Sequence, residues 1–279
     1  MSGEPAEQRP RGMGGGRNLP VAVLVGVLLA ALFLGSLLWR SEAFTVVVVL
    51  FAAGACLEAG RVLRAVGVRL LTVVLVLTVV VSVGGANLAG ASGQVLGLVV
   101  LLVGSAIALL MAERSREVLA TLAPTALFGL WIALPASYAV LLVERPDGPV
   151  VVLAVIGSAI VADIGGYGFG VPFGRHKIAP SISPNKSWEG FIGGLVVSGA
   201  LAALVLPLVG DTFTPGSAAL LAVLCGTAAF VGDLFESMVK RDLGVKDLGM
   251  LLPGHGGILD RVDGILVALP VGHYALLLL

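Results

Sequence analysis

Nine long apolar segments run through this chain and leave few folds open to it. A membrane span needs about 20 mostly apolar residues, and only helices or closed barrels satisfy their backbone groups in lipid. The segments lack the alternation of barrel strands, so we expect an all-α polytopic integral membrane protein with about nine transmembrane helices. The second, third and sixth segments are short and can extend through weakly polar flanks. The approximate limits are Leu19–Trp39, Ala43–Leu57, Leu70–Gly84, Val95–Met111, Leu119–Val143, Pro149–Ala162, Phe191–Val209, Ser217–Phe235 and Val262–Leu279.

The composition agrees with a membrane protein and excludes a soluble or disordered chain. Of the 279 residues, 58% are hydrophobic and 12% are charged, which is roughly half the charged share of a soluble domain. The 17 basic and 17 acidic residues balance, so net charge indicates no particular partner beyond the lipid bilayer, and we expect no nucleic acid. Cys56 and Cys225 both lie in apolar segments and are interpreted as small core residues.

The basic residues predict the orientation of the chain in the membrane. All but two of the 17 Lys and Arg residues, Arg40 and Arg145, fall in the N-terminal tail or in every second connection. Because basic residues are retained on the cytoplasmic side, we expect a cytoplasmic N-terminus and an extracytoplasmic C-terminus in the inner (cytoplasmic) membrane. Residues 1–17 are predicted to be a disordered tail and residues 18–162 the N-terminal helices. Residues 163–279 are predicted to be a C-terminal transmembrane region with two cytoplasmic loops, 163–190 and 236–261, in which any chemistry is expected.

Most polar side chains outside the N-terminal tail lie in these two loops, and one group of them surrounds the second loop. Residues three or four apart share a helix face, and this spacing recurs on both sides of a glycine-rich stretch. Carboxylates that converge beside flexible backbone and cations are typical of Mg²⁺ bound together with substrate phosphates, whose other oxygens pair with Lys or Arg. The residues concerned are Asp233, Glu236, Ser237, Lys240, Arg241, Lys246, Asp260 and Asp263.

Taken singly, several of these residues have simpler interpretations. Lys240 and Arg241 could be ordinary positive-inside residues, and Asp260 could cap the last helix. Asp233 ends an apolar segment, where an acid is functional by default. Glu58 lies near the inner interface, where it is explained either by a snorkelling side chain or by pairing with Arg61. The concentration of Asp233, Lys240, Arg241 and Asp260 in one segment of the chain favours a ligand site.

The first loop carries a second group of basic and turn-forming residues. Asp163 closes the sixth apolar segment, and Arg175, His176, Lys177 and Lys186 add positive charge. Residues 187–190 have the form of a helix start, with Glu189 in the first turn. The loop therefore predicts a turn that feeds a helix beside the cluster of acids.

The motifs in both loops resemble the phosphatidate cytidylyltransferase (CDP-diacylglycerol synthase) family. The C-terminal pattern runs Ser237-Met238-Val239-Lys240-Arg241, Lys246-Asp247, and His255-Gly256-Gly257-Ile258-Leu259-Asp260-Arg261-Val262-Asp263. The upstream pattern is Gly174-Arg175-His176-Lys177, Ser183-Pro184 and Lys186-Ser187-Trp188-Glu189-Gly190. The resemblance is close over residues 163–264, whereas the N-terminal helices match mainly in kind.

The resemblance implies transfer of CMP from CTP to phosphatidic acid, giving CDP-diacylglycerol and pyrophosphate in phospholipid synthesis. Asp233, Asp260 and Asp263 would then bind Mg²⁺, with the choice between one metal ion and two left open. The implied catalytic residues are Asp233, Lys240, Arg241, Lys246, Asp260 and Asp263. The implied phosphate-binding or hydrogen-bonding residues are Lys177, Ser183, Lys186, Ser237, Asp247, His255 and Arg261. Glu236 is a ligand, a supporting group or a partner of Lys240.

Two further alternatives remain open on the sequence. A transporter would use Glu58, Asp163 and Asp233 as ion sites within the membrane, and another CTP-dependent lipid enzyme would share similar chemistry. Small residues in the seventh segment predict close helix packing, either within the chain or at a homodimer face. These residues are Gly193, Gly194, Ser198 and Gly199.

Overall fold

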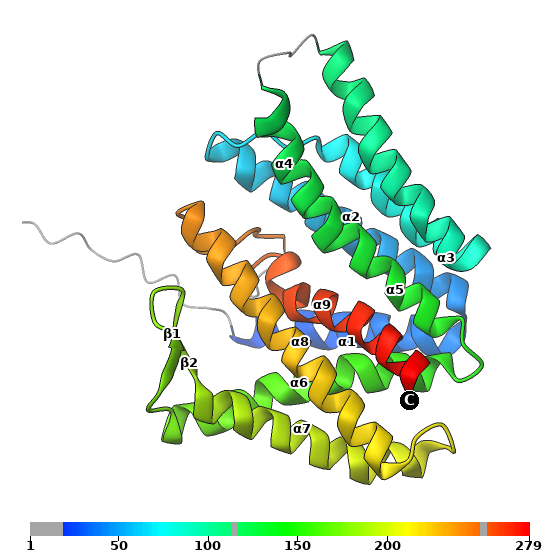
Figure 1. Cartoon of the computed structure of the whole chain (residues 1–279), viewed down its shortest axis with the longest axis vertical. Coiled ribbons are helices and arrows are strands. Elements are labelled where there is room, and N and C mark those ends of the chain that lie inside the picture. The colour runs from blue at the N-terminus through cyan, green and yellow to red at the C-terminus, as the bar shows by residue number, and fades with distance from the viewer. Residues whose placement is uncertain (1–18, 113–116, 252–255) are drawn as a thin grey trace, which may run out of the picture.

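The computed structural model describes residues 19–112, 117–251 and 256–279, and most of these residues are helical. The predicted disordered tail and His255 lie outside the described residues. Figure 1 shows long helices that lie against one another, with a short β-hairpin at one end. In chain order the elements are α1 (Leu19–Trp39), α2 (Ser41–Ala65), α3 (Thr72–Met111), α4 (Val118–Phe128), the π-helix η1 (Gly129–Ala133), α5 (Leu134–Val143), α6 (Gly148–Phe173), β1 (Lys177–Ala179), β2 (Ser183–Ser187), α7 (Trp188–Val209), α8 (Pro215–Asp242) and α9 (Leu259–Leu278).

The predicted all-α membrane architecture is confirmed. Within the described residues, seven helices are long and apolar enough to cross a membrane, counting α4, η1 and α5 as one. The third and fourth predicted segments both lie in α3, whose backbone leaves helical geometry at Ala89 and Gly90. The two halves fold back on each other, since the Ser82 hydroxyl donates to the Gln94 carbonyl at 3.2 Å. Each apolar segment thus coincides with a helix or with half of this helical hairpin, whereas nine crossings stay a prediction.

Two apolar cores share helix α5. One joins α5, α6, α8 and α9 and contains Leu142 and Cys225. The other joins α2, the first half of α3, η1 and α5, and contains Cys56. Both cysteines are fully buried, as expected. The second core also encloses Leu248 and Leu259, so the connection between α8 and α9 is anchored against the N-terminal helices.

The outer surface of the helices is strongly apolar. Leu88, Leu208 and Leu110 expose 87%, 84% and 77% of their surface. Contiguous apolar surface of this kind is rare on soluble monomers. It is favourable against lipid chains, and it agrees with the membrane location inferred from composition.

Glycine contacts bring α6 and α7 close together. A Cβ at Gly194 would collide with the Ala162 carbonyl, and one at Gly190 would lie 2.8 Å from the Gly166 carbonyl. The Ser198 hydroxyl donates to the Ser158 carbonyl at 2.9 Å. The small residues of α7 therefore serve packing within the chain. Because the glycine-rich part of α6 is packed in this way, the helix continues to Phe173, beyond the end of its apolar segment.

The β-hairpin links the end of α6 to the start of α7 (Figure 1). Its strands are antiparallel, with Lys177 opposite Ser187. The Ser187 hydroxyl accepts a hydrogen bond from the Gly190 amide at 3.2 Å, which caps the start of α7. This confirms the helix start predicted at residues 187–190 and fixes the hairpin beside the helices that carry the acids.

The hairpin of α3 provides a test of the packing. A Cβ at Gly93 would collide with the Gly85 carbonyl, whereas one at Gly84 meets nothing within 4 Å. Gly93→Ala should therefore lower the thermal unfolding temperature in detergent, because overpacking costs about 1–3 kcal/mol. Gly84→Ala is the matched control and should keep or slightly raise that temperature, because alanine is the better helix former. Equal behaviour of the two variants would contradict the packing described for the two halves.

Candidate active site

One pocket of about 510 Å³ gathers polar side chains from several elements. Its polar wall comes from β2, α8, α9 and the connection before α9, and its apolar wall includes Ile160 and Ile164 of α6 and Leu195 of α7. A pocket with one polar and one apolar wall suits an amphipathic ligand. It lies beside the β-hairpin, because Ser183, Lys186 and Ser187 of β2 line it.

Three carboxylates converge in this pocket. Asp233 and Glu236 are one helical turn apart on α8, and Asp263 faces them from α9; one ligand atom of each lies within 4.8 Å of the others. Two glycines allow this approach: a Cβ at Gly232 would lie 2.7 Å from the Asp263 carbonyl, and one at Gly264 would lie 2.9 Å from the Ala229 carbonyl. The close crossing of α8 and α9 therefore creates the acidic cluster.

The cluster has the properties of a cation site. Glu236 is only 2% exposed, and its Oε1 atom is buried with no hydrogen-bond partner among the described groups. A buried carboxylate oxygen without a donor is unfavourable unless a cation or a proton binds it. Three converging carboxylate oxygens are hard ligands of the kind that divalent cations such as Mg²⁺ bind. Asp233, Glu236 and Asp263 could hold such an ion.

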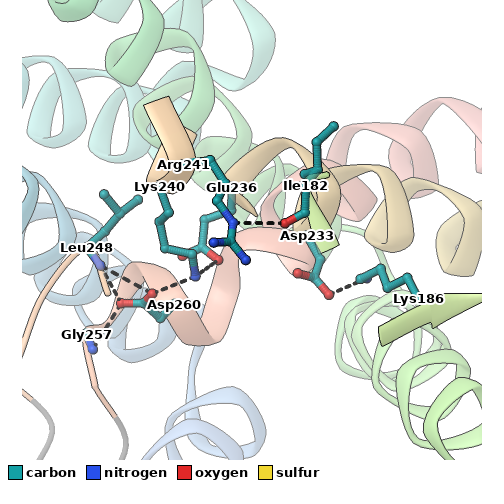
Figure 2. A network of polar contacts seen from close by, with 9 residues as sticks. All are labelled: Ile182, Lys186, Asp233, Glu236, Lys240, Arg241, Leu248, Gly257 and Asp260. Carbon is teal, nitrogen blue, oxygen red and sulfur yellow. Dashed lines mark hydrogen bonds and ion pairs between the residues drawn. The ribbon is translucent and has the colours of Figure 1, made fainter. Parts of the chain in front are cut away.

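Lys240 connects this cluster to Asp260. Its Nζ atom lies 2.6 Å from Glu236 Oε2 and 3.0 Å from Asp260 Oδ1 (Figure 2). Asp260 also accepts hydrogen bonds from the backbone amides of Leu248, at 3.0 Å, and Gly257, at 3.2 Å. The oxygens of Asp260 are thus engaged by protein donors, and Asp260 lies outside the group of three carboxylates.

The β-hairpin brings further positive charge to the pocket. Lys186 of β2 is paired with Asp233 (Figure 2), and its Nζ atom lies 4.4 Å from the centre of the Phe230 ring. Arg241 Nε donates to the Ile182 carbonyl at 3.2 Å, which ties the end of α8 to the hairpin turn. Strands and helices from different parts of the sequence are therefore held together by these cations.

The structure brings most of the predicted site residues into this pocket. Those that line it are Ser183, Lys186, Asp233, Lys240, Asp247, Asp260, Arg261 and Asp263. Four others lie in the described chain but do not line the pocket: Lys177, Ser237, Arg241 and Lys246. His255 falls in the range that is not described.

Two acids emerge more clearly from the structure than from the sequence. Glu236 completes the cluster, and its spacing of three residues from Asp233 was the available signal. Asp163 of α6 lines the same pocket, although sequence alone left it open as a transporter ion site. Asp163 and Asp233 thus belong to one pocket at one end of the helices.

Glu58 contacts the connection between α8 and α9. Its side chain is 2% exposed, and its carboxylate accepts hydrogen bonds from the amides of Leu251, at 2.5 Å, and Ile258, at 2.6 Å. These backbone donors replace the expected pairing with Arg61, and the burial excludes a snorkelling side chain. Both simpler interpretations of Glu58 are therefore wrong.

Comparison with known proteins agrees with the C-terminal motif. Residues 20–279 match the profile of the Cytidylyltransferase family. The phosphatidate cytidylyltransferase of Mycobacterium bovis is 35% identical over 288 aligned residues, which cover 95% of this chain and 93% of that protein. The protein of the same name from Mycobacterium leprae is 46% identical over 155 residues, covering 56% of this chain and 49% of the relative. In Haemophilus influenzae, a phosphatidate cytidylyltransferase is 47% identical over 118 residues, covering 40% and 41%.

The family profile and the Mycobacterium bovis relative both extend over nearly the whole chain, N-terminal helices included. The match therefore covers both the helices and the pocket, and not the motif residues alone. The resemblance seen in the two loops is confirmed by this extent. The chain belongs to the cytidylyltransferase family of nucleotidyltransferase enzymes.

Proposed function

We propose that this protein is a phosphatidate cytidylyltransferase, which transfers CMP from CTP to phosphatidic acid and yields CDP-diacylglycerol and pyrophosphate. The observation that carries the proposal is the single pocket in which an acidic cluster and lysines face an apolar wall. A nucleotide needs the polar side, and a diacyl lipid needs the apolar side. The names of the relatives support the same pair of substrates.

The proposed reaction demands charge neutralisation more than proton transfer. A phosphate oxygen of phosphatidic acid bonds to the α-phosphorus of CTP. The bond from that phosphorus to its bridging oxygen breaks, and the electron pair leaves with pyrophosphate. A phosphate monoester is mostly dianionic near neutral pH, so it needs no strong base to attack. The two reacting phosphate groups are both anionic and repel each other. Cationic side chains and correct positioning lower the activation barrier that this repulsion causes.

The lysines of the pocket are placed for this role. Lys186 and Lys240 both line the pocket, and each pairs with acids there. When a phosphate group binds in the pocket, its anionic oxygens can pair with the Nζ atoms of these two lysines. We assign Arg241, Lys246 and Lys177 to the phosphates from the rim. The proposed hydrogen-bonding groups are Ser183, Ser237, Asp247, His255 and Arg261.

We propose Mg²⁺ as the bound cation, with Asp233, Glu236 and Asp263 as its ligands. Bound there, the ion would reduce repulsion between the two phosphate groups. Asp260, expected from the sequence to be a ligand, is assigned instead to holding Lys240, because its oxygens accept bonds from Lys240 and two backbone amides. Glu236 replaces Asp260 in the proposed ligand set because its carboxylate lies in the cluster with Asp233 and Asp263.

We further propose that the pocket faces the cytoplasm of a multi-pass protein in the inner membrane. If the two halves of α3 each cross the bilayer, the connections rich in Lys and Arg share one side. In Figure 1 the β-hairpin lies at the left of the molecule, and the C-terminus lies toward the right. This arrangement supports nine crossings with a cytoplasmic N-terminus and an extracytoplasmic C-terminus.

The reaction itself can be measured directly. Purified protein with radiolabelled CTP, phosphatidic acid and Mg²⁺ should move label into the lipid phase, with matching release of pyrophosphate. EDTA should stop both signals, because the acidic cluster would lose its cation. If a folded sample labels another lipid phosphate or alcohol but not phosphatidic acid, the acceptor is wrong. If no lipid is labelled, the proposed activity is wrong.

Substitutions can separate ligands from supporting residues. Asp263→Asn and Glu236→Gln should each lower kcat/KM by about 100-fold or more and raise the Mg²⁺ concentration needed for half-maximal rate. Asp260→Asn should lower kcat by about 10–100-fold without changing that Mg²⁺ concentration. Asp242→Asn is the control, because Asp242 is exposed at the end of the same helix, away from this pocket.

The Mg²⁺ titration decides between these roles. If Asp260→Asn shifts the titration as strongly as Asp263→Asn, Asp260 is a ligand and our assignment is wrong. If Asp263→Asn and Glu236→Gln keep most of their activity at every Mg²⁺ concentration, the cluster is not the metal site.

The orientation predicts the location of the C-terminus. A reporter that is active only outside the cytoplasm, fused after Leu279, should give a signal. The same reporter inserted after Gly244, between α8 and α9, should give none. A cytoplasmic C-terminus would contradict the nine-span arrangement.

A further inference from the structure

The connection between α8 and α9 is held from two sides by carboxylates. On one side, Asp260 accepts hydrogen bonds from the amides of Leu248 and Gly257. On the other side, Glu58 of α2 accepts from the amides of Leu251 and Ile258. These four amides flank residues 252–255 in the sequence. These four amides of the described connection are therefore already used by acids of the protein.

Glu58 fits this connection too closely to be an incidental contact. Both of its hydrogen bonds are short, at 2.5 and 2.6 Å. Gly249 packs against the carboxylate so tightly that a Cβ there would collide with it. The Ile258 side chain occupies the space beside Gly54, one turn earlier on α2. The surface of α2 is thus shaped around this connection.

The contacts continue from Glu58 into the acidic cluster. The Gly257 amide, next to the Ile258 amide that Glu58 binds, donates to Asp260. Asp260 in turn holds Lys240, which contacts Glu236 of the cluster (Figure 2). A shift of the connection at Glu58 would therefore move the acceptor that positions Lys240.

We infer that Glu58 is a positioning residue of the active site, supplied by the N-terminal helices. It holds the α8–α9 connection so that Asp260 and Lys240 keep their places beside the cluster. The inference rests on the proposed function for its kinetic consequence, whereas its structural consequence can be measured without any substrate.

Two variants disturb this contact from opposite sides. Glu58→Gln keeps the size of the side chain but replaces one acceptor oxygen by an NH₂ donor, so one of the two amides loses its acceptor. Gly249→Ala leaves Glu58 intact and pushes a methyl group against its carboxylate. Arg61→Gln is the control, because Arg61 is an exposed residue one turn further along α2.

Hydrogen exchange provides the direct readout. In both variants, amide exchange in peptides covering residues 248–258 should rise by about tenfold, whereas exchange in α6 and α7 and the unfolding temperature should stay near wild type. In the lipid-labelling assay kcat should fall by about 10–100-fold with a smaller change in KM for CTP. Arg61→Gln should match wild type in every measurement.

Several outcomes would overturn the inference. If Glu58→Gln shows the same amide exchange and the same kcat as the wild type, the contact of Glu58 with the α8–α9 connection does not position Asp260 and Lys240. Global destabilisation of Glu58→Gln, together with wild-type exchange and kcat in Gly249→Ala, would show a purely structural role. If the wild type transfers no CMP while amide exchange still rises in the variants, the proposed function is wrong, but the conclusion that Glu58 holds the α8–α9 connection is supported.

Discussion

Carboxylates buried among apolar helices must each find a cation or hydrogen-bond donors, and the rest of this structure is arranged around that requirement. An isolated ionised acid costs several kcal/mol or more in such surroundings. Lys240 lies between Glu236 and Asp260, and Lys186 pairs with Asp233. Glu58 has backbone amides instead of a cation. One buried oxygen of Glu236 has no donor within the described chain, and this incomplete compensation supports the proposal that a cation binds the cluster.

Close helix packing determines where these charged groups lie relative to one another. Gly232 and Gly264 let α8 and α9 approach until their acids meet. Gly190 and Gly194 do the same for α6 and α7, which places the β-hairpin and its Lys186 over the end of α8. In a bilayer, helices gain little from apolar contact with one another, so small residues and polar contacts decide where they associate. The same glycines therefore determine both the packing and the shape of the pocket.

The sequence predicted those features that depend on local pattern. Apolar length located the helices, and a serine followed by an acid in the first turn located the start of α7. Spacing placed Asp233 and Glu236 on one face. The sequence did not predict that Asp260 would be occupied by Lys240 and two amides, because that depends on how the connection folds back. It also could not place Glu58, whose partners lie about two hundred positions away in the chain.

This long-range contact changes how the two parts of the chain should be understood. The C-terminal part of the chain contains all three carboxylates of the acidic cluster, and the N-terminal helices contain none of them. Yet Leu248, within the α8–α9 connection, and Leu259, at the start of α9, are buried in the core that includes α2 and the first half of α3. Glu58 adds the polar contact that a purely apolar core cannot provide, because apolar packing alone tolerates small shifts in register. The N-terminal helices thus act as the rigid support for a site whose reacting groups they do not supply.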